Sequence, residues 1–260
     1  QPYDGNPYNL FGRNTDSAQI RSSDSFRGGV TYRKNVFTFD AAVDYMKQGP
    51  SLFQPLTISG ETMPIAFLRA SIDLKTFNYF QFVGWLRTQK NRSKFMYHHR
   101  LQFPLFNKRC IVAINEIILN GSTTEDAQDD SLELRRYNIE RKLEPVYLIP
   151  FIPYAFAEHY VGDQDNAIMS FDINVDLPFN LRWYGELFID DFTPKIWSND
   201  WGNKWALTSG MEHFGQLLHK PFVSQIEYTR IEPWVYTHFY GGSHRYTHYG
   251  SIIGSNIGPN

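Results

Sequence analysis

Between positions 167 and 177, apolar and polar side chains alternate almost without exception. The residues on one side of the pattern are Ala167, Met169, Phe171, Ile173, Val175 and Leu177. The residues on the other side are Ile168, Ser170, Asp172, Asn174 and Asp176. A period of two predicts an extended strand with one apolar and one polar face. Asp172 and Asp176 therefore share the polar face of a predicted strand.

Similar patterns separated by short polar turns predict strands along most of the chain. Residues Arg33 to Asn35, for example, predict a tight turn between two alternating segments and hence a hairpin. We predict strands at 28–34, 36–46, 65–74, 76–87, 95–106, 110–120, 167–177, 181–192, 205–218, 222–231 and 234–240. Strands of about ten residues that follow one another through turns are typical of an antiparallel meander or a barrel.

Three segments lack a strand pattern. Residues 1–27 are rich in Pro, Gly, Asn and Ser and predict irregular chain, and residues 48–64 contain three prolines and two glycines and predict a loop. Residues 121–142 are charged and poor in aromatic residues, which predicts a long polar insertion with a helical turn from Ser131 to Glu140. We therefore expect an irregular N-terminal segment at 1–27 and one all-β domain at 28–260 that carries the insertion.

Composition narrows the class of protein. Of the 260 residues 17% are aromatic, and the net charge is −2. A strand-rich chain with this aromatic content is typical of sandwiches, carbohydrate-binding β-proteins and outer-membrane barrels. The near-neutral charge argues against a nucleic-acid partner. No apolar run reaches the ~18 residues of a transmembrane helix, and the single cysteine, Cys110, excludes an intrachain disulfide.

Acidic residues are concentrated in the predicted strand at 181–192. Glu186 and Asp190 share one face of this strand, roughly 13 Å apart along its length. This separation exceeds the distance between the two catalytic carboxylates in both retaining and inverting glycosidases. An acid from the neighbouring strand could supply a closer partner. The simpler interpretation is that such carboxylates pair with inward arginines, such as Arg100 and Arg182, in a polar interior.

The sequence offers no other familiar catalytic or metal site. The eight histidines lack a compact metal-ligand spacing, and the adjacent His98 and His99 point to opposite faces of a strand. Cys110 is flanked by apolar residues and lacks a Cys–His arrangement. There is no Gly-x-Ser-x-Gly elbow, phosphate-binding glycine loop or dinucleotide fingerprint. We therefore predict no catalytic residue, no metal and no cofactor.

Aromatic residues beside amides and acids are typical of glycan-binding loops, because aromatic faces stack on sugars. The loops at 193–203 and 241–244 supply four candidate glycan-binding residues, which are Trp197, Asn199, Trp201 and His244. In a membrane barrel, aromatic residues also form girdles at the two membrane interfaces. Composition alone therefore leaves both interpretations open.

A series of motifs occurs in a fixed order in the second part of the chain. They are His99-Arg100 in a predicted strand, Glu116 within AINEIILNG, the Pro-rich LEPVYLIPFIPYAFAE ending at Glu158, Asp165-Asn166, YGELFIDDF at 184–192, IEYTRIEPWVYTH at 226–238 and YTHYGSIIGSNIGPN at 246–260. This series resembles the Wzi family of capsule-assembly proteins of the Gram-negative outer membrane. The resemblance covers roughly residues 97–260, and several motifs in order are more specific than any one alone.

The resemblance implies an antiparallel outer-membrane β-barrel with a polar, plugged lumen, acting as a lectin for capsular polysaccharide and not as an enzyme. It places the apolar strand faces against outer-membrane lipid. The polar faces then form a lumenal network, for which the candidates are Arg100, Glu116, Asp172, Asp176, Glu186, Asp190 and Glu227. It also implies that closing strands follow Asn260, because family members continue beyond this point.

We therefore expect a non-catalytic protein of the outer membrane of a Gram-negative bacterium that binds surface polysaccharide in capsule assembly. Other outer-membrane proteins are possible partners. Two alternatives remain at this stage. The chain could be a structural subunit of an outer-membrane transport or secretion complex, or it could be a glycan-active enzyme.

Overall fold

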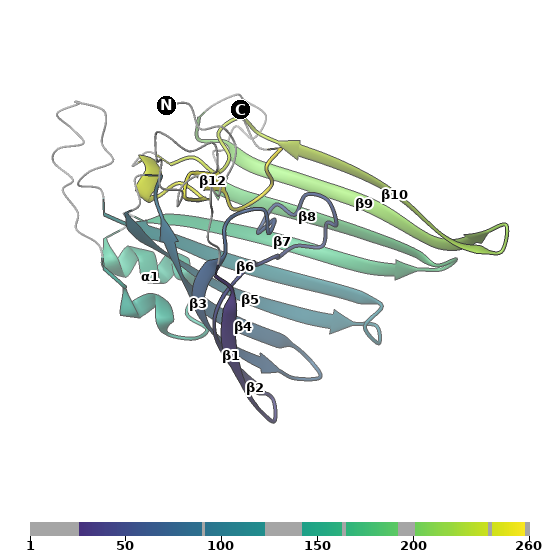
Figure 1. Ribbon diagram of the computed structural model, residues 1–260, viewed down its shortest axis with the longest axis horizontal. Helices are drawn as coiled ribbons and strands as arrows, with labels where there is room; N and C mark the ends of the chain where they lie inside the picture. The colour runs from purple at the N-terminus through teal and green to yellow at the C-terminus, as the bar shows by residue number, and fades with distance from the viewer. Residues whose placement is uncertain are drawn as a thin grey trace, which may run out of the picture.

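The computed structural model describes residues 26–89, 92–122, 142–162, 165–191, 201–238 and 241–257. Its main feature is a ten-stranded antiparallel sheet in which each strand lies beside the next in the chain (Figure 1). The strands are β1 (Gly28–Lys34), β2 (Phe37–Asp44), β3 (Ile65–Asp73), β4 (Asn78–Arg87), β5 (Ser93–Leu105), β6 (Cys110–Gly121), β7 (Asn166–Leu177), β8 (Leu181–Asp191), β9 (Lys204–Leu217) and β10 (Lys220–Ile231).

The all-β prediction is confirmed at the level of this sheet. In the described part of the chain, the bounds of these ten strands lie within two residues of the predicted ones. The additional strand predicted at 234–240 is wrong. Val235 N donates to Glu232 O at 3.2 Å and Thr237 N to Trp234 O at 3.2 Å. These bonds between residues three apart form turns, so this segment bends instead of continuing the sheet.

Short and long connections lie at opposite ends of the sheet. Tight turns join β1 to β2, β3 to β4, β5 to β6, β7 to β8 and β9 to β10, and all of them lie at one end (Figure 1). The opposite end carries the longer connections. Among the described strands, β1 pairs only with β2 and β10 only with β9, so both outer edges lack a second neighbour.

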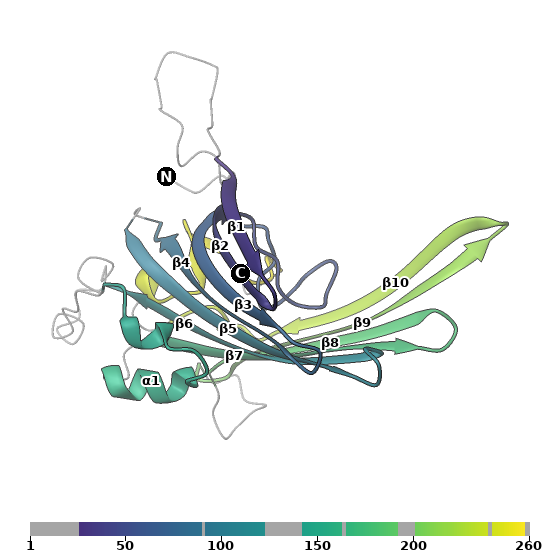
Figure 2. The same cartoon turned by 90° about the horizontal axis from the view of Figure 1, so that it is seen from below.

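The sheet is strongly curved, and two segments occupy its concave side (Figure 2). The first is the connection from β2 to β3, residues 45–64, which we call the inner loop. The second consists of residues 232–238 and 241–257, which we call the C-terminal segment; it contains η4 (Gly241–Ser243), β11 (Thr247–His248) and β12 (Ser251–Ile252). Both segments pack on the sheet in one core cluster, which includes Leu56, Ile58, Phe82, Met96, Ile117, Phe188, Tyr236 and Tyr246.

A short helical hairpin covers part of the convex side. It consists of η3 (Pro145–Leu148) and α1 (Tyr154–Val161), neither of which the strand pattern predicts. Pro153 directly precedes α1, and Gly162 ends it with a φ of 109° in the left-handed region. Proline at the start and glycine just past the end are a common pair of helix boundaries. These two residues were the sequence signal for this helix.

The rest of the convex face exposes a continuous band of apolar side chains. Cross-strand pairing aligns Ile114 with Phe171, Phe171 with Leu187, and Leu187 with Leu207. The exposed fractions are 41% for Ile114, 37% for Phe171 and 38% for Leu207. We call this band the apolar belt, and it comprises Leu101, Val112, Ile114, Phe171, Ile173, Leu187, Leu207 and Met211.

Buried polar side chains and an apolar core cluster thus share the concave side, whereas the exposed belt on the convex side is apolar. In β7 the polar residues Asn166, Ser170 and Asp172 are buried on the concave side, while Phe171 between them is exposed. The alternation at 167–177 is thus a true strand with two different faces. Its polar face is buried from Asn166 to Asp172, and its apolar face is exposed at Phe171 and Leu177. Within the described ranges, no helix is both long enough and apolar enough to cross a bilayer.

Candidate functional site on the concave face

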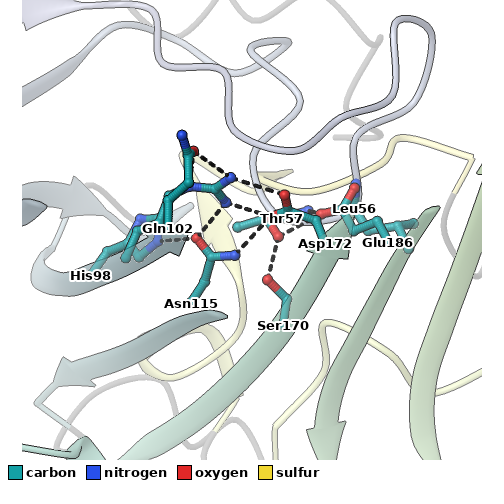
Figure 3. Close-up of polar contacts among 9 residues, drawn as sticks. Leu56, Thr57, His98, Gln102, Asn115, Ser170, Asp172 and Glu186 are labelled. Carbon is teal, nitrogen blue, oxygen red and sulfur yellow. Dashed lines mark hydrogen bonds and ion pairs between the residues drawn. The ribbon is translucent and has the colours of Figure 1, made fainter. Parts of the chain in front are cut away.

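Arg100 and Asp172 form a buried ion pair on the concave face (Figure 3). Arg100 Nη2 donates to Asp172 Oδ1 at 2.9 Å, and Arg100 Nη1 donates to Asp172 Oδ2. Asn115 Nδ2 donates to the same carboxylate at 3.2 Å, and its Oδ1 accepts from Arg100 Nη1 at 3.1 Å. Strands β5, β6 and β7 each contribute one member. An ion pair between an inward carboxylate and Arg100, expected from the sequence, is thus present at Asp172.

Glu186 holds the inner loop on the sheet. Its Oε2 accepts from Leu56 N at 2.9 Å, and its Oε1 accepts from Thr57 N at 2.7 Å and from Thr57 Oγ1 at 2.5 Å. Thr57 Oγ1 also lies 2.7 Å from Ser170 Oγ (Figure 3). The loop approaches so closely that a Cβ added at Gly49 would lie 2.7 Å from Glu186 Oε2. This carboxylate therefore binds backbone instead of the arginine that the sequence suggested.

A second set of polar contacts holds the inner loop near β8 and β10. Ser51 Oγ donates to Glu227 Oε2 at 2.6 Å, and Tyr184 Oη donates to the same oxygen at 2.5 Å. Arg182 Nη2 donates to Pro50 O at 3.1 Å. The inner loop thus crosses the concave face from β2 towards β10 and is bonded to side chains along its path.

Asp190 and two tyrosines attach the C-terminal segment. Asp190 Oδ2 accepts from Tyr236 N at 2.8 Å. Tyr236 Oη donates to Leu56 O at 3.0 Å, and Tyr246 Oη donates to Thr57 O at 2.5 Å, so the two covering segments also bind each other. Burial raises the pKa of Tyr246 well above its usual value, because the phenolate would be desolvated. Both hydroxyls therefore serve as donors.

Lys94 is a second attachment point that the sequence reasoning missed. Its Nζ donates to Arg245 O at 2.7 Å, to Gly242 O at 3.1 Å and to Thr247 Oγ1 at 3.3 Å. The side chain is fully buried despite its charge. A lysine at the start of a predicted strand is usually exposed, so the sequence carried no signal for this role.

Two histidines of the C-terminal segment, His238 and His248, are held in the neutral form. Burial, with a contribution from Lys204, lowers the pKa of His238 to about 4. Burial and the nearby Lys94 lower the pKa of His248 to about 3, and its Nδ1 accepts from Arg87 N at 3.0 Å. In the described ranges, no group of three or more His, Cys, Asp and Glu side chains is arranged to hold a metal ion.

The structure places the seven predicted members of the polar network in different surroundings. Five are concave-face residues that bind one another or the covering segments, and these are Arg100, Asp172, Glu186, Asp190 and Glu227. Asp176 lies opposite Arg182 on this face but is exposed close to the turn. The assignment of Glu116 to this network is wrong, because Glu116 pairs in register with Met169 and shares the convex face of β6 with Ile114 and Ile118.

The four predicted glycan-binding residues also lie in different surroundings. Trp197 and Asn199 lie outside the described residues. Trp201 is 41% exposed at the end of the sheet that carries the long connections. His244 is only 1% exposed, its Nε2 lies 3.9 Å from Asp165 Oδ1 and its ring stacks on that of His238. The prediction that His244 lies on a loop open to a glycan is therefore wrong, because protein covers its imidazole.

Asp172 and Glu186 are direct cross-strand partners and therefore neighbours on this face. Both are buried, and both bind structural partners in this conformation. The arrangement fixes covering segments and leaves neither carboxylate open to a substrate. No protein-family model matches the chain, and searches among curated proteins and among solved structures found no match.

Proposed function

We propose that this chain forms part of the wall of a plugged outer-membrane β-barrel in a Gram-negative bacterium and holds surface polysaccharide without catalysing a reaction. One observation carries the membrane location. The apolar belt is exposed on the convex face, whereas the polar side chains of the same strands are buried and bonded on the concave face. This polarity is favourable when hydrocarbon surrounds the sheet and unfavourable in water.

The connections support the same proposal. Short turns gather at one end of the sheet and longer connections at the other (Figure 1). Outer-membrane barrels have this asymmetry, with short turns on the periplasmic side and longer loops on the extracellular side. In this orientation Trp201 lies towards the cell exterior, where a surface glycan would be bound.

A sheet in hydrocarbon must have its edge strands paired, because unpaired backbone groups are costly there. The proposal therefore requires further strands to pair with the free edges of β1 and β10. Strands of other chains would meet this requirement as well as strands of one chain. The open edges thus favour a second candidate function, a structural subunit of a larger outer-membrane assembly.

The covered concave face favours anchoring over conduction. The inner loop and the C-terminal segment are bonded to the sheet through Glu186, Asp190 and Glu227, and to each other through Tyr236 and Tyr246. Such segments would fill the lumen of the barrel. The motifs that resemble the Wzi family add the polysaccharide as the expected ligand.

Cell fractionation tests the location. We expect the protein in the outer-membrane fraction, with a heat-modifiable migration on gels, and recovery in the soluble fraction would contradict the proposal. Stable co-purification with other barrel proteins would instead support the subunit alternative.

Retention on native capsular polysaccharide tests the ligand. Trp201→Ala should weaken retention, because it removes an exposed aromatic face, whereas Phe106→Ala at the opposite end of the sheet should not. Phe106 is a matched control because its ring is 78% exposed. Equal retention by both variants would show that Trp201 is not the site. Turnover of the polysaccharide that disappears in Glu186→Gln or Asp190→Asn would instead favour the enzyme alternative.

A further inference from the structure

The helical hairpin on the convex face, residues 145–161, has polar groups beneath it and apolar groups on its outer surface. It packs on β4, β5 and β6 through a small core cluster of its own. The buried members of this cluster are Val83, Tyr97, Ile118, Tyr147, Tyr154 and Ala157. Figure 2 shows α1 on the side of the sheet opposite the C-terminal segment.

A polar pair of the convex face lies under this hairpin. His99 Nε2 is 2.5 Å from Glu116 Oε2, and the same oxygen accepts from Tyr154 N at 3.0 Å. The His99 ring stacks on Tyr154 at a centroid distance of 4.2 Å. Gln81 Nε2 is also covered, because it donates to Tyr147 O at 2.6 Å. The hairpin thus shields polar groups that interrupt an otherwise apolar face.

The outer surface of α1 has the opposite character. Phe156 is 72% exposed and Tyr160 is 84% exposed. Glu158 is buried on the inner side, and the basic residue His159 is exposed in the last turn. A helix at a water-exposed surface presents charged residues outward and apolar residues inward. In α1, by contrast, a carboxylate is buried and two aromatic rings are exposed.

An apolar groove continues this surface between η3 and the first four strands. Its volume is about 510 Å³, and convex side chains form most of its lining, among them Val30, Phe39, Leu68, Val83, Leu148 and Pro150. In water, such a groove would be unfavourable. In a bilayer, acyl chains would fill it.

We infer that the hairpin 145–161 is embedded in the membrane beside the sheet, with Phe156 and Tyr160 among the lipids at the interface near the long connections. Bilayer lipid is the occupant that fits, because the hairpin extends the apolar belt and buries the polar groups that hydrocarbon would penalise. Aromatic rings at this level are typical of membrane interfaces. The inference rests on the proposed membrane location of the sheet.

Site-directed spin labelling tests the inference on the protein in lipid vesicles. The single native cysteine is first removed as Cys110→Ser, and labels are then introduced one at a time. Phe156→Cys and Tyr160→Cys report on the hairpin, Leu207→Cys on the apolar belt, and Phe106→Cys on a turn at the far end. Accessibility to oxygen, which partitions into lipid, is compared with accessibility to a water-soluble nickel complex.

We expect the labels at 156, 160 and 207 to be more accessible to oxygen than to nickel, and the label at 106 to show the reverse. A lipid-exposed label at 207 with water-exposed labels at 156 and 160 would overturn the inference and leave the proposed function intact. A water-exposed label at 207 would instead overturn the membrane location itself. Labels at 156 and 160 that neither reagent reaches would show a protein partner on the hairpin and would also overturn the inference.

Discussion

At the scale of single residues, the buried charges of the sheet are matched with specific partners. Asp172 binds a guanidinium, whereas Glu186 binds two backbone N–H groups and a hydroxyl. The sequence could predict that both carboxylates share one strand face, because this follows from parity. It could not predict the partner of Glu186, because the inner loop lies 130 residues away from it in the chain.

Glu186→Gln should release the inner loop locally. The glutamine amide would keep one acceptor but would turn a donor towards the N–H groups of Leu56 and Thr57. A buried N–H group that loses its acceptor costs about 1–3 kcal/mol, so we expect amide exchange at these two residues to accelerate by about tenfold. Mass spectrometry after hydrogen exchange measures this effect. The exposed carboxylate of Asp176 provides the control, and a similar acceleration in Asp176→Asn would contradict the assigned role.

Arg100 and Asp172 should show strong coupling in a double-mutant cycle. Either Arg100→Met or Asp172→Leu leaves one buried charge without its partner, which typically costs about 3–5 kcal/mol. The double variant removes both charges, so its loss should be clearly smaller than the sum of the two single losses. Urea unfolding in detergent micelles gives the three free energies. Additive losses would show that the pair is not coupled.

Glu116 illustrates what a residue-level prediction can miss. Its parity with Ile114 and Ile118 was readable in the sequence and places it on the apolar face of its strand. The family resemblance nevertheless assigned Glu116 to the polar interior. A charged residue on an apolar face requires a cover, and here the cover is an unpredicted helix.

At the scale of elements, the inner loop and the C-terminal segment are held by close approach as well as by hydrogen bonds. Gly49 has a φ of 124° and lies against the Glu186 carboxylate. The sequence predicted irregular chain at 48–64, which the structure confirms. It gave no indication that this loop folds back across the sheet, because that path depends on contacts between residues far apart in the chain.

Gly49→Ala should disturb the inner loop more than Gly162→Ala disturbs the end of α1. Both substitutions place a Cβ on left-handed backbone, since Gly162 has a φ of 109°. Only at Gly49 does the Cβ meet another group, whereas no atom lies within 4 Å of it at Gly162. Thermal unfolding in micelles compares the two variants. A loss of stability in Gly49→Ala that does not exceed that in Gly162→Ala would contradict the close approach.

Acidification should remove the contribution of His248 to the docking of the C-terminal segment. His248 has a pKa of about 3 in the folded protein and an ordinary value of 6.5. Between about pH 3 and pH 6.5, His248 is therefore protonated in the unfolded segment but neutral in the docked segment. Full stability is present above about pH 6.5 and is lost progressively as the pH falls towards about 3. At pH 5 the loss is about 2 kcal/mol for this histidine.

Hydrogen exchange of residues 232–257 at pH 7 and pH 5, corrected for intrinsic rates, measures this effect. His248→Asn supplies the control, because the amide oxygen can accept from Arg87 N as the imidazole does but does not titrate. We expect a smaller acid-induced loss of protection in this variant than in the protein with His248. An unchanged response would exclude His248 as its source.

At the scale of the whole molecule, the proposed membrane location follows from the two different faces of one curved sheet. The sequence predicted the alternation and the antiparallel order, because both follow from local periodicity and turn spacing. The covering segments and the helical hairpin were not predictable in this way. Their positions depend on side-chain contacts across the sheet, such as those of Lys94 and Tyr246, which no local pattern contains.

The most direct test of the central claim is photolabelling of the full chain in bilayers by a phospholipid that carries a diazirine on its acyl chain. The adducts are mapped to residues by mass spectrometry. We predict adducts on the apolar belt, including Ile114, Phe171 and Leu207, and none on the concave neighbours Asn115 and Ser170. Adducts on both faces, or absence of adducts from the belt, would contradict a convex surface that faces lipid.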